Sequence, residues 1–256
     1  MPSFTTPAPI TTALTTAGAH VRITAGDRPD TVVRVEPLNS ANKTDVKVAE
    51  RTKVDFADGT LSIKTTKSGA KAGSVAITVE LPAGSALVLN TAWTDVHATG
   101  PLGDCELNTA SGDIRLDRVI ALRGNLGDGA VEIGHVPGAV DVDGGAARLR
   151  LGEVDGTVHY QGSHGSLTVD RADGDVTASA ANCPIRIGHV TRGHVELANA
   201  SGGIHIGIAD GITAEVDANS TKGVVRNTLT TQTNPADTVK IHARTRLDDI
   251  VIHPAD

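Results

Sequence analysis

Apolar and polar residues in the middle of the chain recur with a period of about eighteen residues. The repeating unit contains short apolar–polar–apolar triplets that fall into two columns. The first column runs through Val96-His97-Ala98, Ile114-Arg115-Leu116, Val131-Glu132-Ile133, Leu149-Arg150-Leu151, Leu167-Thr168-Val169, Ile185-Arg186-Ile187 and Ile204-His205-Ile206. The second runs through Cys105-Glu106-Leu107, Val140-Asp141-Val142, Val158-His159-Tyr160, Val176-Thr177-Ala178, Val195-Glu196-Leu197 and Ala214-Glu215-Val216. Because alternate side chains of each triplet face opposite sides, the triplets predict β-strands and not helices.

Turn-forming residues separate the two columns. Glycine and serine recur at 110–113, 127–129, 144–145, 163–166 and 200–203. These residues accept the tight or left-handed backbone angles of a corner. Short strands that repeat with the same corner form one coil of a solenoid, and successive coils stack in parallel. The sequence therefore predicts an all-β fold, a parallel β-solenoid or single-stranded β-helix with coils of about 18 residues, which we expect to be right-handed.

The two ends of the chain are less regular than the middle. We expect strands at 10–16, 20–25, 31–36, 45–55, 60–66, 74–81 and 86–90, loops at 64–71 and 228–237, and closing strands at 238–244 and 249–253. A solenoid needs caps because its terminal coils expose unpaired strand edges. We therefore divide the chain into an irregular N-terminal β region and cap (1–90), regular repeats (91–230) and C-terminal capping strands (231–256).

Aromatic residues are scarce. The chain has 256 residues, of which 39% are hydrophobic, but its only aromatics are Phe4, Phe56, Trp93 and Tyr160. Such a composition disfavours helical bundles, antibody-like sandwiches and aromatic nucleic-acid platforms, because rings supply the most buried area per residue. A narrow solenoid needs few rings, since each inward residue must fit against its equivalent in the next coil. Tyr160 fits this scheme because its equivalents are Val142 and Ala178.

Charge and targeting signals exclude several classes of partner. The net charge of −7 argues against binding to nucleic acid or an anionic membrane, because both need a basic face. No stretch approaches the roughly 20 apolar residues of a membrane span, and the start of the sequence lacks the segments of a secretory signal. We therefore expect a cytoplasmic protein. Cys105 and Cys183 lie about four coils apart, too far for a disulfide, and Cys105 occupies a position that valine takes elsewhere.

The repeat carries a family resemblance. The segment Ala110-Ser111-Gly112-Asp113-Ile114 and its weaker copies resemble the Ser-Gly-Asp-Ile repeat of the bacterial DUF4097 family, which is described as adhesins of β-strand repeats. The runs at 20–23, 27–35, 79–85 and 237–241 resemble the actinobacterial branch of that family. The resemblance spans essentially the whole chain and implies a β-repeat fold. It implies no reaction, cofactor or catalytic residue.

The outward ladders offer few candidates for chemistry. Asp141 and His159 are neighbours in the second column, where the carboxylate could orient the imidazole for acid–base catalysis, and His164 lies at the adjoining corner. An exposed pair of this kind is more often incidental. No metal site or cofactor is predicted, because His135 and His189 lie three coils and roughly 14 Å apart.

Three hypotheses for the function remain. The first is a non-enzymatic interaction scaffold or adhesin-like protein that binds a protein, small molecule or glycan. Its alternative is a lyase, isomerase or cyclase of a carbohydrate or specialised metabolite, with His159, Asp141 and His164 as acid–base groups. Trp93 and Tyr160 are the candidate ligand-binding rings, although Trp93 is also interpreted as a packing plug where the repeat begins. A homo-oligomer formed through one end of the stack is a third hypothesis.

Overall fold

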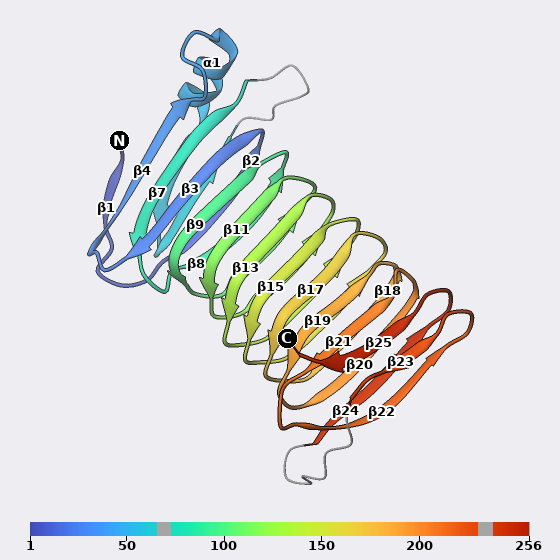
Figure 1. Cartoon of the computed structure of the whole chain (residues 1–256). Coiled ribbons are helices and arrows are strands. Elements are labelled where there is room, and N and C mark those ends of the chain that lie inside the picture. The colour runs from blue at the N-terminus through green and yellow to red at the C-terminus, as the bar shows by residue number, and fades with distance from the viewer. Residues whose placement is uncertain (66–72, 230–237, 256) are drawn as a thin grey trace. The chain divides into compact units, whose positions relative to one another are not determined.

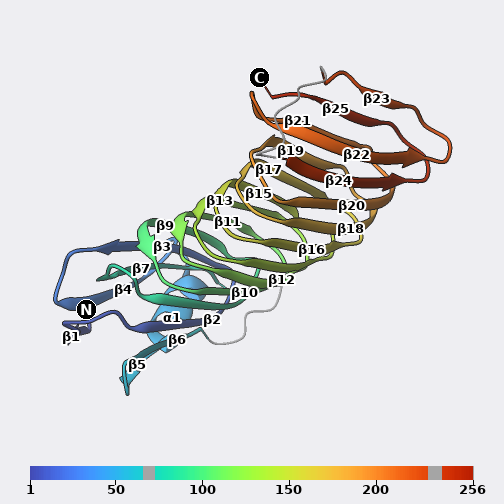
Figure 2. The ribbon, with the colours of Figure 1, turned by 90° about the horizontal axis from the view of Figure 1, so that it is seen from below.

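The computed structural model describes residues 1–65, 73–229 and 238–255. The predicted loops at 64–71 and 228–237 lie largely outside these ranges. The chain divides into two compact units, Met1–Gly129 and Ala130–Asp256. This boundary differs from the predicted three-part division, which stays a prediction. Each unit contains two sheets that lie opposite each other (Figures 1 and 2), and the prediction of an all-β fold with mainly parallel strands is confirmed.

The first unit contains helix α1 (Lys43–Arg51) and the strands β1 to β12. The strands are β1 (Ser3–Thr5), β2 (Thr11–Ala17), β3 (Ala19–Gly26), β4 (Asp30–Pro37), β5 (Lys53–Ala57), β6 (Thr60–Lys64), β7 (Val75–Pro82), β8 (Ala86–Ala92), β9 (Asp95–Leu102), β10 (Cys105–Thr109), β11 (Asp113–Val119) and β12 (Leu122–Leu126). One sheet has the order β1-β4-β7-β3-β9-β11, and the other has the order β5-β6-β2-β8-β10-β12. The pairs β1/β4, β4/β7 and β5/β6 are antiparallel, and the others described in this unit are parallel.

The strand predicted at 45–55 is wrong. Lys43–Arg51 form a helix, and strand β5 begins only at Lys53. The alternation of Val46, Lys47 and Val48 resembles a strand, but the side chain of Asn42 caps a helix by accepting a hydrogen bond from the Thr44 N–H at 3.0 Å. Local capping therefore outweighs the short alternating pattern.

In the second unit all the secondary-structure elements found among the described residues are strands. They are β13 (Ala130–Val136), β14 (Val140–Gly144), β15 (Arg148–Val154), β16 (Val158–Gly162), β17 (Ser166–Ala172), β18 (Val176–Asn182), β19 (Ile185–Val190), β20 (His194–Ser201), β21 (Ile204–Ile208), β22 (Thr213–Ser220), β23 (Val225–Asn227), β24 (Thr238–Thr245) and β25 (Ile250–Pro254). Their orders are β13-β15-β17-β19-β21-β25-β23 and β14-β16-β18-β20-β24-β22. From β13 to β21 the first column is in the predicted register, as the pairing of Leu149 with Leu167 and of Leu167 with Ile185 shows. The prediction that places the last triplet of the second column, 214–216, next to 195–197 is wrong, because β24 pairs with both.

The last two strands do not close the stack as the sequence predicted. Residues 238–245 and 250–254 do form strands, but β24 lies between β20 and β22, and β25 lies between β21 and β23. Among the described residues, β22 and β23 are the outermost strands of this unit. The first unit has a matching arrangement, in which β2 and β3 lie inside β6 and β7. In both units a segment close to one end of the sequence is thus paired on both sides.

Stacked aliphatic side chains fill most of the space between the sheets, and Tyr160 is the one aromatic side chain that is buried among the described residues. It pairs with Val142 and Ala178, as predicted. The ring has room because Gly144 and Gly162 flank it: a Cβ atom on Gly162 would lie 2.5 Å from the Tyr160 hydroxyl oxygen. The structure thus supplies a second reason, two glycines, why a ring fits in one coil.

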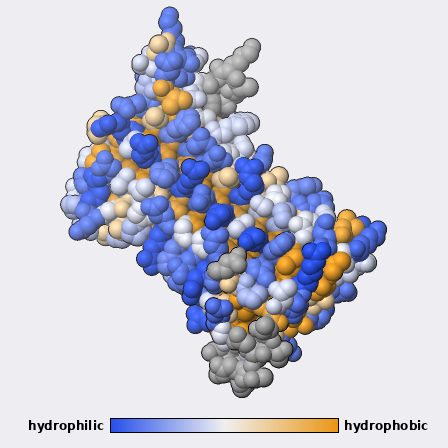
Figure 3. Space-filling view, in the orientation of Figure 1, coloured by the Kyte–Doolittle hydropathy of each residue, from blue (hydrophilic) through white to orange (hydrophobic). Residues whose placement is uncertain are grey.

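The face shown in Figure 3 is largely hydrophilic, and its apolar atoms lie in narrow strips between polar side chains. In the described part of the chain no helix has the length and apolar character needed to cross a bilayer.

Candidate functional site

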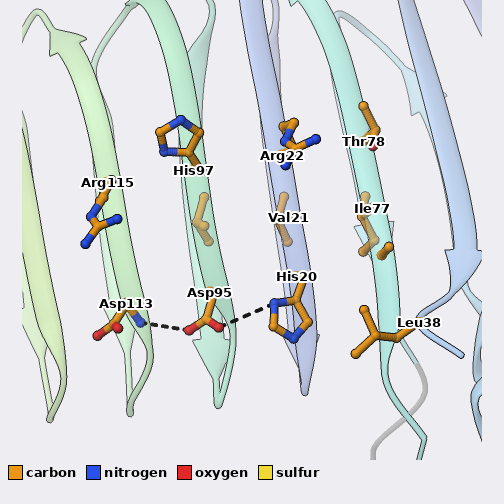
Figure 4. Close-up of a pocket in the computed structure, with 12 residues that line it drawn as sticks. His20, Val21, Arg22, Leu38, Ile77, Thr78, Asp95, His97, Asp113 and Arg115 are labelled. Atoms are coloured by element: carbon orange, nitrogen blue, oxygen red, sulfur yellow. Dashed lines mark hydrogen bonds and ion pairs between the residues drawn. The ribbon is translucent and has the colours of Figure 1, made fainter.

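A groove lies on the outward face of four neighbouring strands of the first unit, β7, β3, β9 and β11 (Figure 4). Its volume is about 540 Å³. The side chains that carry its chemistry are His20, Arg22, Asp95, His97, Asp113 and Arg115. The groove is shallow and open to solvent, which suits an extended ligand that lies along the sheet.

Strand alternation arranges these side chains in two rows. In β3, Val21 is buried while the residues on either side of it face outward. The register joins His20 to Asp95 in one row, which continues to Asp113. The other row, two residues further along each strand, joins Arg22 to His97 and then to Arg115. The result is a mixed row beside a cationic row.

The carboxylates around the groove are already engaged. Asp95 lies 3.4 Å from the His20 imidazole and accepts a hydrogen bond from the Asp113 backbone N–H at 3.1 Å. On the other side of the cationic row, Glu80 pairs with Arg28, and Asp117 accepts from a backbone N–H at 3.1 Å. These contacts hold the acidic groups in place and partly satisfy their charge.

Two members of the cationic row have no such partners. Within the residues described, Arg22 and His97 show neither a hydrogen bond nor an ion pair, and both side chains are exposed. They lie directly opposite each other on paired strands. An anion bound here would therefore meet N–H donors of Arg22 and His97 that no other described group uses.

Leu38 gives the groove an apolar edge. It follows strand β4, and its backbone N–H donates to the Ser74 carbonyl at 3.1 Å. Its side chain is 49% exposed and lies at the margin of the groove beside His20 (Figure 4). A ligand that combines an anionic group with an apolar surface would therefore contact both kinds of wall.

Trp93 lies at the corner between β8 and β9 and is 70% exposed. The interpretation of Trp93 as a packing plug is therefore wrong. The register of β8 with β2 and β10 places it between the small residues Gly18 and Ser111. The backbone N–H of Trp93 donates a hydrogen bond to the Ser111 hydroxyl at 3.3 Å. Trp93 does not itself line the groove, but it precedes the groove residue Asp95 by two positions, so their Cα atoms lie within about 7 Å of each other.

The structure brings together two of the three predicted catalytic residues. Asp141 and His159 are partners in register on β14 and β16. The His159 ring nitrogen lies 3.2 Å from the Gln161 amide. His164 lies at a corner, 3.5 Å from the Asn182 amide. All three predicted residues are exposed, so nothing around them removes water from a substrate.

Tyr160 is not available to a ligand. Its side chain is 1% exposed, and its hydroxyl lies 3.9 Å from the Cys183 sulfur in the core. Burial raises the pKa of the Tyr160 hydroxyl. The prediction that Tyr160 binds a planar ligand is therefore wrong, because the ring serves packing inside the coil.

One acidic cluster in the second unit resembles a cation site but is internally compensated. Oxygen atoms of Glu153, Asp155 and Asp173 lie within 4.8 Å of one another. Arg171 lies 3.6 Å from Glu153 and 3.1 Å from Asp173, while His135 lies 2.9 Å from Asp155. Burial alone would raise the pKa of Asp173, but hydrogen bonds from Thr191 and Arg171 lower it. We assign the cluster to an ion-pair network.

The two facing sheets of stacked parallel strands, with a groove that faces solvent, define a β-repeat protein. Residues 12–253 match the family described as Toastrack DUF4097. The chain belongs to the DUF4097 family. Its placement in the actinobacterial branch stays a prediction. No curated protein matches the sequence.

Several solved structures are similar in fold. A "putative adhesin" from Bacteroides fragilis is 15% identical, with a TM-score of 0.47 over 98% of this chain and 95% of that chain. One from Parabacteroides distasonis is 12% identical, with a TM-score of 0.46 over 97% and 95% of the two chains. A "Putative lipid binding protein" from Parabacteroides distasonis is 11% identical, with a TM-score of 0.32 over 100% and 94%.

Proposed function

We propose that this chain is a non-enzymatic binding scaffold and that the groove over β7, β3, β9 and β11 is its site for an anionic ligand. One observation carries the proposal. Arg22 and His97 face solvent side by side without a partner among the described residues, whereas the carboxylates that surround them are engaged.

The chemistry of the row supports an anion as ligand. A guanidinium presents five N–H donors and binds a carboxylate, sulfate or phosphate in a bidentate manner. Arg115 continues the row on the next strand, at the usual strand spacing of about 4.8 Å. The protein as a whole carries a net charge of −7, so long-range attraction of polyanions is absent and affinity must come from these contacts. This is the reason why nucleic acid and anionic membrane are not proposed as partners.

The predicted lyase, isomerase or cyclase is not carried into this proposal. Asp141, His159 and His164 are exposed on a sheet face and a corner, where the described side chains form no pocket that would hold a substrate away from bulk water. Four finer predictions from the sequence are kept as proposals: a right-handed coil of about 18 residues, a cytoplasmic location, an adhesin-like role, and a homo-oligomer formed through one end of the stack.

Calorimetric titration with three polyanions tests the proposed site: polygalacturonate, poly-L-glutamate and dextran sulfate at low ionic strength. Arg22→Ala should weaken the binding of every polyanion that binds the wild type by about tenfold, the usual worth of a charge-assisted hydrogen bond. The matched control is Arg186→Ala, which removes an outward arginine from the second unit and should leave affinity unchanged. Equal affinity of the wild type and Arg22→Ala, or no binding of any polyanion, would refute the proposal.

A further inference from the structure

Trp93 occupies a position at which a tryptophan does not contribute to the stability of the fold. Its φ angle is +48°, in the left-handed region that a bulky side chain rarely occupies. The equivalent corner residue on the neighbouring strand pair is Gly18, which has a φ of +70° at no steric cost. Trp93 also leaves most of its indole in water. Both features cost stability, and strained residues of this kind cluster at ligand-binding positions.

The corner anchors the backbone of Trp93 and leaves its indole open to solvent. Its neighbours in the column, Gly18 and Ser111, are too small to cover the ring. The backbone around Trp93 is anchored by its hydrogen bond to the Ser111 hydroxyl and by the buried Thr94, whose hydroxyl lies 3.2 Å from that of Thr16. An exposed aromatic ring on an anchored backbone offers a flat apolar surface on which a ligand ring can stack.

The groove beside Trp93 offers two kinds of polar partner. Arg22 and His97 can donate to an anionic group, while the carboxylates of Asp95 and Asp113 lie one row away. An ionised carboxylate has about four acceptor sites, so Asp95 can accept further hydrogen bonds beside those it already receives. The ligand that satisfies this surface carries both an anionic group and hydroxyl donors.

We infer that the groove binds an acidic glycan, an oligosaccharide that contains uronic acid residues. This inference rests on the proposed function and names the class of ligand for the same site. One sugar ring stacks on Trp93, the hydroxyls donate to Asp95 and Asp113, and the uronate carboxylate binds Arg22 and His97. An acidic peptide or a polyphosphate fits less well, because it brings anionic groups toward the carboxylate row without hydroxyls to bind it.

Trp93 is the only tryptophan of the chain, so its fluorescence reports on this corner alone. The probe is tetragalacturonic acid, and the two comparison ligands are its carboxyl-reduced, neutral counterpart and poly-L-glutamate. We expect tetragalacturonic acid to shift the tryptophan emission and to protect it from quenching by acrylamide. The neutral counterpart should bind at least tenfold more weakly, because it lacks the group that the cationic row holds.

Two variants, measured by calorimetry, separate the roles. Trp93→Gly keeps the corner because Gly18 shows that glycine adopts this backbone, and it should lose about tenfold in affinity for tetragalacturonic acid. Its affinity for poly-L-glutamate should not change. Arg22→Ala should weaken both ligands, whereas Trp93→Tyr should recover much of the glycan affinity that Trp93→Gly loses.

The outcomes distinguish the two proposals. If poly-L-glutamate binds through Arg22 as tightly as tetragalacturonic acid does and the tryptophan emission does not change, the anion site stands and the glycan inference is refuted. The glycan inference also fails if the neutral oligosaccharide binds as well as the acidic one, because the carboxylate would then contribute nothing. If no ligand binds in an Arg22-dependent way, both proposals fail.

Discussion

At the residue scale, Cys105 shows what a thin core does to a titratable side chain. The thiol is 3% exposed and packs in register between Leu87 and Leu122. Burial raises its pKa to about 12, since a thiolate cannot be solvated there. The neutral thiol therefore behaves as a small apolar side chain, as its place in a column of aliphatic residues predicted.

The raised pKa of Cys105 makes stability depend on pH on the alkaline side. Above pH 9, the unfolded chain releases the thiol proton at its ordinary pKa of 9.0, whereas the folded chain keeps it. The unfolded state thus binds fewer protons, and the free energy of unfolding falls as pH rises from 9 to about 12. By pH 10.5 this one group accounts for about 2 kcal/mol of the loss.

Urea unfolding of the reduced protein at pH 8 and pH 10.5 measures this loss. Cys105→Val should remove the part that belongs to Cys105 while it keeps the shape of the column. The buried Cys183 and Tyr160, whose pKa values burial also raises, titrate in the same direction in both proteins, so the comparison isolates one thiol. An alkaline loss of the same size in wild type and variant would contradict the assignment.

The sequence predicted the burial of Cys105 but not the exposure of Trp93. The core position of Cys105 follows from its own column, because burial in a repeat is dictated by the local alternation. The exposure of Trp93 depends instead on the size of the two residues beside it in space, Gly18 and Ser111, and Gly18 is distant in the sequence. No local pattern identifies that neighbour.

At the element scale, one aromatic ring in a coil requires space from two strands. Gly144 and Gly162 pair with each other, and both lie under the ring of Tyr160. On the next strand, β18, the partner of Tyr160 is Ala178, which has no ring. The partner of Gly162 on that strand is Ala180, so alanine is tolerated where no ring needs the space. Glycine in these two strands thus reflects close packing rather than a turn.

Gly162→Ala should destabilise the protein by about 1–3 kcal/mol, because the new methyl group would overlap the Tyr160 ring. Thermal or urea unfolding measures the effect. In the double variant with Tyr160→Leu, the alanine should cost much less, since the ring is gone and the two substitutions are coupled.

Gly26→Ala is the matched control, because a Cβ there meets nothing within 4 Å. Its effect should stay within about 0.5 kcal/mol. Equal costs for alanine at 162 in the presence and absence of the tyrosine ring would show that the ring is not the cause.

The strands of the regular repeat could be predicted, whereas the groove could not. The outward positions of His97 and Arg115 are visible in the triplets, since each strand follows its equivalent by about eighteen residues. Arg22 joins them only because β3 lies between β7 and β9. That pairing joins segments more than fifty residues apart, and no repeat in the sequence predicts it.

At the scale of the whole molecule, both units insert an end of the sequence into the stack instead of leaving it outside. Strands β2 and β3 pair on both sides in the first unit, and strands β24 and β25 do so in the second. Edge strands expose unpaired backbone groups that invite association. In these two units the strands nearest the ends of the sequence, apart from the short β1, have no such edge.

Hydrogen exchange measured by mass spectrometry on the intact protein should distinguish strands that pair on both sides from strands at an edge. Amides of β24 should exchange more slowly than those of β22, although β24 lies nearer the end of the sequence, because β22 has one described partner strand and β24 has two. Strand β20, which also pairs on both sides, should resemble β24. Faster exchange in β24 than in β22 would contradict the described strand order.

The inserted strands also dictate when each part of the chain can reach its place during synthesis. A strand such as β17 can pair with β15 as soon as it leaves the ribosome, because its neighbour is already made. Strands β22 and β23 emerge before the strands on which they dock, so they must wait as unpaired chain until β24 and β25 are complete. Strands of the middle coils can therefore pair one after another in the order of synthesis, whereas the last strands cannot.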